Sequence, residues 1–308
     1  MDISNPQNKV ALIAGPTASG KTALALHLAK SGNFIIINAD SAQVYSDLPI
    51  LSAQPTAEEQ RSVPHHLFGY LDGITPCSAA RWAADARGVI AHAHATGKTP
   101  ILVGGSGLYI RTLLDGIAPI PEVTLELRTE IRAMPVEQAY AALQHYDAPI
   151  AASLAPSDIS RITRALEVVQ STGRSISEWR KSKTGGIGDS ITLRPLLLLP
   201  PRDWLYKRCD NRFEIMMERG AVAEVEALLL RNLPQDAPVM RAIGVPEISA
   251  YLNGNLQHDE AIARGKIATR QYAKRQFTWF RNQAPIAWPR IELEINDSNA
   301  DNFETIFQ

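Results

Sequence analysis

A glycine-rich segment near the N-terminus limits the folds open to this chain more than any other feature. Residues 15–22 read Gly-Pro-Thr-Ala-Ser-Gly-Lys-Thr and fit the phosphate-loop pattern G-x-x-x-x-G-K-[ST] at every fixed position. An apolar run of strand type, 10–14, precedes the loop, and a helix-like stretch, 23–29, follows it. In this setting consecutive backbone amides point at one anion, and the dipole of the helix favours negative charge. The sequence therefore predicts a phosphate or diphosphate site, while the loop alone does not say whether phosphate is transferred or leaves.

The last two residues of this loop carry its side-chain chemistry. Lys21 would place a positive charge at a terminal phosphate, and the hydroxyl of Thr22 would bind Mg²⁺, the expected cofactor. Thr22 is the metal ligand that we predict. The residues expected to bind the diphosphate or nucleotide are Gly15, Pro16, Thr17, Ala18, Ser19, Gly20, Lys21 and Thr22.

Composition indicates an ordinary globular protein. The 308 residues are 45% hydrophobic and 20% charged, with a formal net charge of -1, which argues against indiscriminate binding of polyanions. The two cysteines, Cys77 and Cys209, match no metal or redox spacing. Residues 1–6 lack the basic-then-apolar pattern of a secretory signal, and no apolar run approaches membrane-spanning length. We therefore expect a cytoplasmic protein without membrane contact.

Two further strand-like runs lead to polar residues. Residues 34–38 are followed by Asp40-Ser41, and residues 100–103 are followed by Gly105-Ser106. Strands that alternate with helical stretches indicate an α/β protein with a P-loop NTPase-like parallel sheet flanked by helices. Because ligands of such sheets gather beyond the carboxyl ends of the strands, we expect these segments and the phosphate loop to form one cleft.

The pattern changes from about Asp115, where helical stretches follow one another without a strand. Helices are expected over 123–134, 136–146 and 158–172. A glycine-rich loop, 181–188, precedes the apolar run 196–199, which returns the chain to the sheet. We therefore divide the chain into a P-loop catalytic core with a basic C-terminal helix, 1–114 and 192–308, and an all-helical insertion domain, 115–191.

The C-terminal part of the core is predicted to be helical. Helices are expected over 210–218, 221–231 and 259–282. No acidic residue occurs from 261 to 291, and at about 100° per residue several cations of the last helix fall within an arc of about 80°. They are Lys266, Arg270, Lys274 and Arg281. These cations either form a solvated face or contact a phosphate backbone, and the missing counter-charges favour an RNA-binding surface.

Asp40 has two interpretations when only its position is considered. A carboxylate near the phosphate loop can bind Mg²⁺ or accept a proton from an attacking nucleophile. Aspartate is equally favoured as the N-cap of a helix, where its side chain accepts from a backbone amide. The residues around Asp40 leave both interpretations open.

Seven segments together resemble one family, the tRNA dimethylallyltransferases (adenosine-37 isopentenyltransferases, the IPP transferase family). They occur in the family's order and cover nearly the whole chain from about residue 9 to 282. The segments are the phosphate loop at 15–22, NADSAQVY at 38–45, VPHHL at 63–67, VGGSGLY at 103–109, RITRALEV at 161–168, RAIG at 241–244 and TRQYAKRQ at 269–276.

The resemblance implies transfer of a dimethylallyl group from dimethylallyl diphosphate to N6 of adenosine 37, next to the anticodon of tRNAs that read codons starting with U. Asp40 then matches the general base, Arg212 the arginine that neutralises the diphosphate, and Ser106 the family's threonine at the diphosphate and adenine. The implied partners are the donor and the anticodon stem-loop of tRNA, and we expect a monomer. The residues expected to bind tRNA, from the resemblance or from the basic helix, are Asp40, Ser41, Ala42, Gln43, Ser106, Arg128, Ser160, Arg161, Ile162, Thr163, Arg164, Arg241, Ala242, Ile243, Gly244, Lys266, Arg270 and Lys274.

The chain departs from the family pattern at a few positions. Ser106 replaces a threonine, Ser46-Asp47 replaces Arg-Gly, and both Gln54 and Pro246 stand where lysine is usual. None of these lies in the phosphate loop. Three alternative functions are a P-loop small-molecule kinase, an adenylate isopentenyltransferase that acts on free nucleotides, and a non-enzymatic RNA-binding nucleotide switch.

Overall fold

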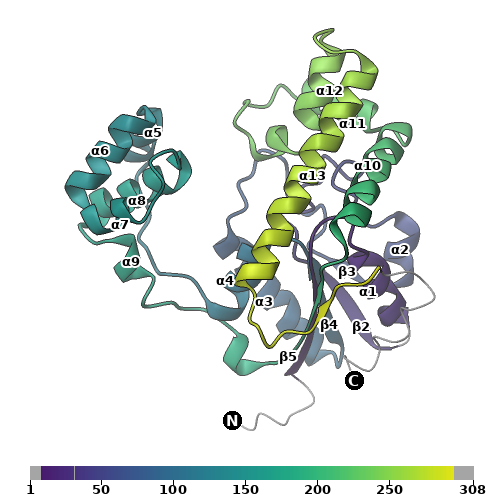
Figure 1. The fold of residues 1–308 in the computed structure, drawn as a ribbon. Helices are drawn as coiled ribbons and strands as arrows, with labels where there is room; N and C mark the ends of the chain where they lie inside the picture. The colour runs from purple at the N-terminus through teal and green to yellow at the C-terminus, as the bar shows by residue number, and fades with distance from the viewer. Residues whose placement is uncertain (1–7, 31, 295–308) are drawn as a thin grey trace. The chain divides into compact units, whose positions relative to one another are not determined.

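The computed structural model describes residues 8–30 and 32–294 (Figure 1). The start of the chain, 1–6, which was interpreted above as lacking a secretory signal, lies outside this part. The described strands form one parallel sheet in the order β3-β2-β4-β1-β5-β6. They are β1 (Lys9–Ala14), β2 (Phe34–Asn38), β3 (His65–His66), β4 (Thr99–Gly104), β5 (Thr192–Leu198) and β6 (Arg290–Ile291). The predicted α/β class, a parallel sheet flanked by helices, is confirmed.

The sheet is covered on both faces. Strand β1 lies between β4 and β5, with Ile13 beside Val103 and Leu196. Successive side chains of a strand point to opposite faces, so Ile13 packs in the cluster that includes Leu24 of helix α1, while Leu12 points to the other face and is also fully buried. Burial on both faces explains why these strands are apolar runs rather than alternating patterns.

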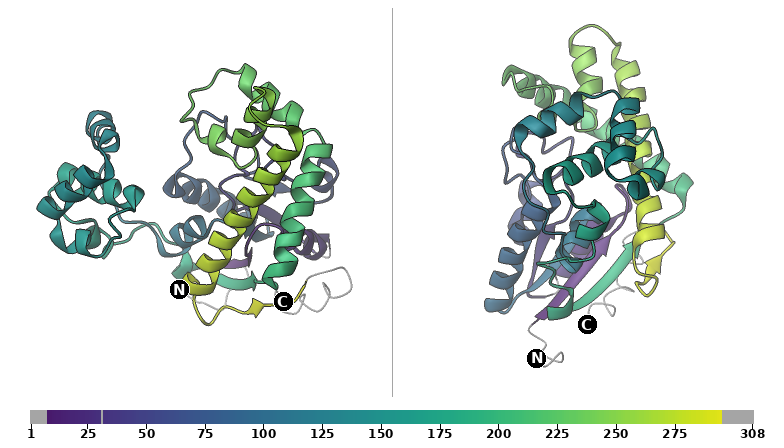
Figure 2. Two further views of the ribbon diagram at one scale, coloured as in Figure 1. Left: turned by 45° about the horizontal axis from the view of Figure 1, so that its top comes forward. Right: turned by 90° about the vertical axis from the view of Figure 1, so that its left-hand side faces the viewer.

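The helices of the core pack around this sheet and above its carboxyl edge (Figures 1 and 2). They are α1 (Lys21–Lys30), α2 (Ala57–Ser62), α3 (Ala79–Ala95), α4 (Gly107–Asp115), α10 (Arg202–Glu218), α11 (Ala221–Leu230), α12 (Val245–Leu252) and α13 (His258–Gln283), with short 3₁₀ turns η2 (Gly188–Ser190) and η3 (Pro238–Arg241). Within the described ranges, no helix combines the length and the apolar content needed to cross a bilayer.

Helices α10 and α13 lie side by side (Figure 1). Their close approach depends on Gly265, because a Cβ atom there would lie 2.0 Å from the ring of the buried Phe213. Helix α10 begins at Arg202 and not at 210 as predicted, since Pro201 occupies the N-cap position and the first turn extends directly from it.

The chain divides into two compact units, residues 1–113 with 187–308, and Leu114–Gly186. The predicted boundaries were 114/115 and 191/192. The smaller unit is helical and packs Ile131, Leu143 and Leu166 in its own core. Its helices are α5 (Leu125–Ala133), α6 (Val136–Tyr146), α7 (Ala148–Ala152), α8 (Ile159–Thr172) and α9 (Ile176–Trp179).

Candidate active site

The phosphate loop joins β1 to α1 through backbone positions that need glycine. A Cβ atom on Gly15 would lie 2.3 Å from the carbonyl oxygen of Leu198, and Gly20 has a φ of 98°. Helix α1 begins at Lys21, so its first amides have no partner inside the helix and are available to an anion. The hydroxyl of Ser19 is buried and has no hydrogen-bond partner among the described residues. A buried unpaired hydroxyl inside such a loop fits a bound phosphate oxygen.

Two cations lie at this loop, the buried Lys21 and the partly buried Arg212. Lys21 donates from Nζ to the carbonyl oxygen of Pro16 at 2.6 Å, and burial lowers the pKa of Lys21 to about 8 although the Asp40 carboxylate opposes this shift. Burial also lowers the pKa of Arg212, on α10, from its usual value, whereas the charges of Cys209 and Asp40 act to raise it. Removing a cation from water disfavours its charged form, so a bound diphosphate would restore stabilisation that both side chains lack.

Asp40 forms a tight turn rather than a helix cap. Residues 41–44 are turns, and Asp40 Oδ1 accepts from the amide of Ala42 at 3.0 Å. The backbone amide of Asp40 donates to Asn38 Oδ1 at 2.7 Å, which fixes the segment at the end of β2. No hydrogen bond to Oδ2 occurs among the described residues, and Asp40 lines the same cavity as Lys21. The helix-cap interpretation is therefore wrong, and one carboxylate oxygen is available for chemistry.

Ser106 holds the segment next to Asp40. Its hydroxyl accepts from the amide of Ser41 at 2.8 Å and donates to the Ser41 hydroxyl at 3.0 Å. Its backbone amide donates to the carbonyl of Ala39 at 3.1 Å. In this arrangement the Ser106 hydroxyl is used to position the loop after β2. A serine is sufficient for these bonds.

A cavity of about 1580 Å³ opens over the phosphate loop, within the larger unit. The predicted site residues that line it are Thr17, Ala18, Ser19, Gly20, Lys21, Thr22, Asp40, Ser41, Ala42, Gln43, Arg212, Arg241, Ala242 and Ile243. Predicted residues of the same unit that do not line it are Gly15, Pro16, Ser106, Gly244, Lys266, Arg270 and Lys274. The expected meeting of the phosphate loop with the ends of β2 and β4 is therefore observed, since Val103 and Gly104 also line this cavity.

The segment after η3 accommodates one of the departures from the family pattern. Gly244 is the N-cap of α12, and its amide donates to Glu247 Oε2 at 3.0 Å. Pro246 lies in the first turn of this helix. Backbone N–H groups in the first turn have no acceptor inside the helix, so the N–H that proline lacks costs no hydrogen bond there. Arg241 donates to the carbonyl of Asp236 at 2.8 Å.

The basic helix has counter-charges that the sequence did not reveal. Lys266 forms an ion pair with Glu214, and Arg270 donates to both carboxylate oxygens of Asp210 at 2.6 Å. Both acidic residues lie on α10, so these two cations do have counter-charges, and the premise that they lack them is wrong; their contact with tRNA stays a prediction. Lys274 is exposed and makes no ion pair among the described residues.

Sequence reasoning did not assign several residues of this site. Arg208 donates from Nε to the carbonyl of Ala18 at 2.9 Å, and Arg275 lies over the ring of Tyr272 with its guanidinium 5.8 Å from the ring centre. All of these line the cavity. Burial, followed by the Asp40 charge, raises the pKa of Tyr272. Two signals were present: Arg208 precedes Arg212 by about one helical turn, and Tyr272 and Arg275 belong to the segment at 269–276.

The helical unit carries the remaining predicted residues on α5 and α8. Arg128 donates to the carbonyl of Val123 at 3.5 Å, and Arg161 pairs with Asp158 at 3.4 Å. Ser160 is exposed, whereas Ile162 is fully buried in the core of the unit. The predicted tRNA contact is therefore wrong for the side chain of Ile162, because no surface of it is available.

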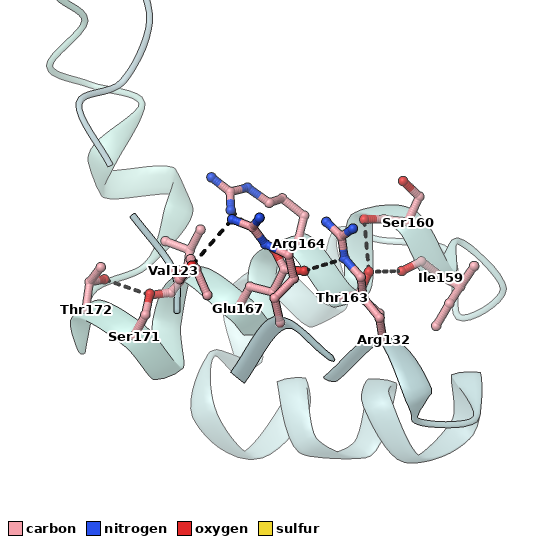
Figure 3. Close-up of polar contacts among 11 residues, drawn as sticks. Val123, Arg132, Ile159, Ser160, Thr163, Arg164, Glu167, Ser171 and Thr172 are labelled. Atoms are coloured by element: carbon pink, nitrogen blue, oxygen red, sulfur yellow. Dashed lines mark hydrogen bonds and ion pairs between the residues drawn. The ribbon is translucent and has the colours of Figure 1, made fainter. Parts of the chain in front are cut away.

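A buried glutamate organises two arginines of this unit (Figure 3). Glu167 Oε1 accepts from Arg132 Nε at 2.8 Å, and Oε2 accepts from Arg164 Nη1 at 3.2 Å. The Glu167 side chain is 1% exposed, while those of Arg132 and Arg164 are 61% and 42% exposed. The hydroxyl of Thr163 instead donates back to the carbonyl of Ile159 at 2.8 Å.

Replacing Glu167 by glutamine should destabilise the helical unit by about 3 kcal/mol, because a buried partner of two guanidinium groups loses its charge. This effect is measured by unfolding the full chain in urea while hydrogen exchange of the α8 amides is monitored. The matched control is Glu178→Gln, which removes an exposed pair with Arg174 and should cost less than about 1 kcal/mol. Equal losses in the two variants would contradict a special role for Glu167.

The loop suits a magnesium ion held with few protein ligands. Thr22 lines the cavity, and its hydroxyl makes no hydrogen bond among the described residues. No cluster of three or more His, Cys, Asp or Glu side chains suited to a metal occurs in the described ranges. Magnesium commonly keeps several waters and binds through one or two side-chain oxygens together with substrate phosphates. The residues present therefore fit this mode of binding.

The fold and this cavity define an α/β protein of the P-loop class with an anion site at the carboxyl edge of its sheet. The family model described as IPP transferase matches residues 43–283. A tRNA dimethylallyltransferase of Sphingopyxis alaskensis is 60% identical over 296 residues, which cover 94% of this chain and 97% of the relative. The chain belongs to the IPP transferase family.

Solved structures agree with this assignment. The full-length tRNA isopentenylpyrophosphate transferase from Bacillus halodurans matches with a TM-score of 0.69 and 33% identity, over 97% of this chain and 95% of that chain. A eukaryotic dimethylallyltransferase acting on tRNA matches with a TM-score of 0.77 and 31% identity, over 89% of this chain and 70% of that chain.

Proposed function

We propose that this enzyme transfers a dimethylallyl group from dimethylallyl diphosphate to N6 of adenosine 37, in tRNAs that read codons starting with U. The observation that carries the proposal is the placement of Asp40 in one cavity with Lys21 and Arg212, at the phosphate loop. A base and two cations suit a reaction in which a proton leaves the acceptor while an anion leaves the donor.

In the proposed reaction the adenine N6 attacks the allylic carbon, the new N–C bond forms, and the C–O bond to diphosphate breaks. Asp40 takes the proton of N6 on Oδ2, while Oδ1 keeps its bond to Ala42. The loop amides, Lys21 and Arg212 stabilise the charge on the departing diphosphate. When bound at Thr22, Mg²⁺ would neutralise further charge on that diphosphate.

The cavity also has surface for the apolar part of the donor. Val103, Tyr109 and Cys77 line it together with the phosphate loop, so the prenyl chain would be shielded from water next to the diphosphate. We expect adenosine 37 to leave its stack in the anticodon loop to enter this cavity, at a cost of a few kcal/mol. We further expect a monomer that works where tRNA is found, in the cytoplasm.

The test is incubation of the enzyme with dimethylallyl diphosphate, Mg²⁺ and an anticodon stem-loop containing A36-A37-A38, with the product identified by mass. The proposal predicts a gain of one isopentenyl unit that disappears when guanosine replaces A37. Phosphate transfer from ATP without prenylation would favour a small-molecule kinase. Equal turnover with free AMP would favour an adenylate isopentenyltransferase.

Lys274 is expected to contribute to tRNA binding through its exposed charge. Replacing it by alanine should weaken binding and reduce the slope of log affinity against log salt by about one, because one phosphate contact is lost. The neutral control is Gln271→Ala, which changes an exposed residue of the same helix. An unchanged salt slope for Lys274→Ala would assign this side chain to a solvated face.

A further inference from the structure

Gln276 connects the C-terminal helix to two loops of the candidate active site. Its side chain is 5% exposed on α13, and both of its polar atoms are used. Oε1 accepts from the backbone amide of Thr17 at 2.7 Å, and Nε2 donates to the carbonyl of Gly105 at 3.1 Å. These partners lie 259 and 171 residues away along the chain. One buried amide group therefore joins α13, the phosphate loop and the turn after β4.

The bond to Thr17 changes what the phosphate loop can offer to a ligand. The loop pattern alone places the Thr17 amide among the donors that surround an anion. A backbone N–H has one hydrogen to donate, and here it is donated to Gln276 over a short distance. The Ser19 amide is also used, because it donates to the carbonyl of Pro16 at 3.3 Å. The anion site is therefore formed by the amides of Ala18 and Gly20 and of the first turn of α1, together with the Lys21 side chain.

The bond to Gly105 brings the same glutamine close to the proposed base. A Cβ atom on Gly105 would lie 2.1 Å from Gln276 Nε2 and 3.0 Å from Asp40 Oδ2. The glycine thus leaves the space in which the amide group and the carboxylate approach the same turn. The next residue, Ser106, is hydrogen-bonded to Ser41, so this turn and the Asp40 segment form one connected unit.

We propose that Gln276 is a positioning residue that fixes the distance between the diphosphate site and Asp40, and that it keeps the Thr17 amide out of that site. This inference rests on the proposed function in one respect, which is the identity of the reaction that Gln276 supports. Gln276 does not touch the reacting atoms. It acts by holding Thr17 and Gly105, and a misplacement of about 1 Å between reacting groups can cost about 100-fold in rate.

The first test needs neither tRNA nor turnover. In the full-length protein, backbone amide signals are recorded while inorganic diphosphate is added, for the wild type and for Gln276→Met. The wild type should show a Thr17 amide that is protected from hydrogen exchange before diphosphate is added and whose signal changes little on binding. In Gln276→Met the Thr17 amide should lose that protection and respond to diphosphate. A Thr17 amide that exchanges freely in the wild type would overturn the proposal.

The second test measures the rate of prenyl transfer in single turnover. Gln276→Met should lower this rate by about 10- to 100-fold with a smaller change in KM for the donor, whereas Gln271→Met, an exposed glutamine of the same helix, should leave both unchanged. Gln276→Glu keeps the acceptor for Thr17 and loses the donor to Gly105, so it should keep Thr17 protected and still lose rate. Rates equal to the wild type in both variants of Gln276 would overturn the proposal. An inactive wild type with a protected Thr17 would instead contradict the proposed function alone.

Discussion

Replacing Asp40 by asparagine should lower the single-turnover rate of prenyl transfer by a factor of about 10²–10⁴, the usual contribution of a positioned general base. Asparagine retains an oxygen that can accept from Ala42, so the turn after β2 is expected to persist. The variant loses only the oxygen that takes the N6 proton. The rate is measured by rapidly mixing the anticodon stem-loop with enzyme that is saturated with dimethylallyl diphosphate, and by quantifying the product by mass.

Binding separates this chemical role of Asp40 from a structural one. Inorganic diphosphate and the anticodon stem-loop should bind Asp40→Asn within a few-fold of their affinities for the wild type. If the variant reacts at nearly the normal rate, Asp40 is not the base. If it loses both ligands, the carboxylate acts in binding or folding.

Replacing Lys21 by methionine should reduce kcat by about 10²–10³, as removal of one well-placed donor to a developing anion does in other enzymes. Lys21 is buried beside the loop, and methionine fills a similar volume without the charge. Affinity for inorganic diphosphate should fall in the same variant. A rate that is unchanged would show that the leaving group is stabilised without Lys21.

The pH dependence gives a second signature of Lys21. With its pKa near 8 before diphosphate binds, Lys21 loses its charge as the pH rises above about 8, so affinity for diphosphate should decrease there. The unfolded chain, with the ordinary value of 10.5, binds more protons between these two values. The Lys21 contribution to folding stability therefore increases with pH over the same window, opposite in sign to the binding effect. Lys21→Met should remove this decrease in affinity.

Local patterns were sufficient to predict the elements that carry the site. Residues 10–14 have the character of a strand and residues 23–29 that of a helix, and the loop between them is rich in glycine. The structure shows why Gly15 is needed there, because a Cβ atom would lie too close to the carbonyl oxygen of Leu198. The α/β class followed from the same alternation. The helical character of 136–146 was predicted from periodicity, and α6 occupies this range.

Contacts between distant segments could not be predicted from such patterns. The charges of Lys266 and Arg270 are balanced by residues on α10, more than fifty positions away, and nothing along α13 indicates this pairing. The bond from Thr17 to Gln276 likewise depends on how α13 packs over the loop. The burial of Ile162 follows from the core of the helical unit, although its neighbours Arg161 and Arg164 are charged.

The most direct test of the account is a crystal structure of the enzyme with an unreactive analogue of dimethylallyl diphosphate, Mg²⁺ and an anticodon stem-loop. We expect diphosphate oxygens on the loop amides, Lys21 and Arg212, with adenine N6 within about 3 Å of Asp40 Oδ2. A diphosphate bound away from the phosphate loop, or an Asp40 carboxylate turned away from the adenine, would contradict it.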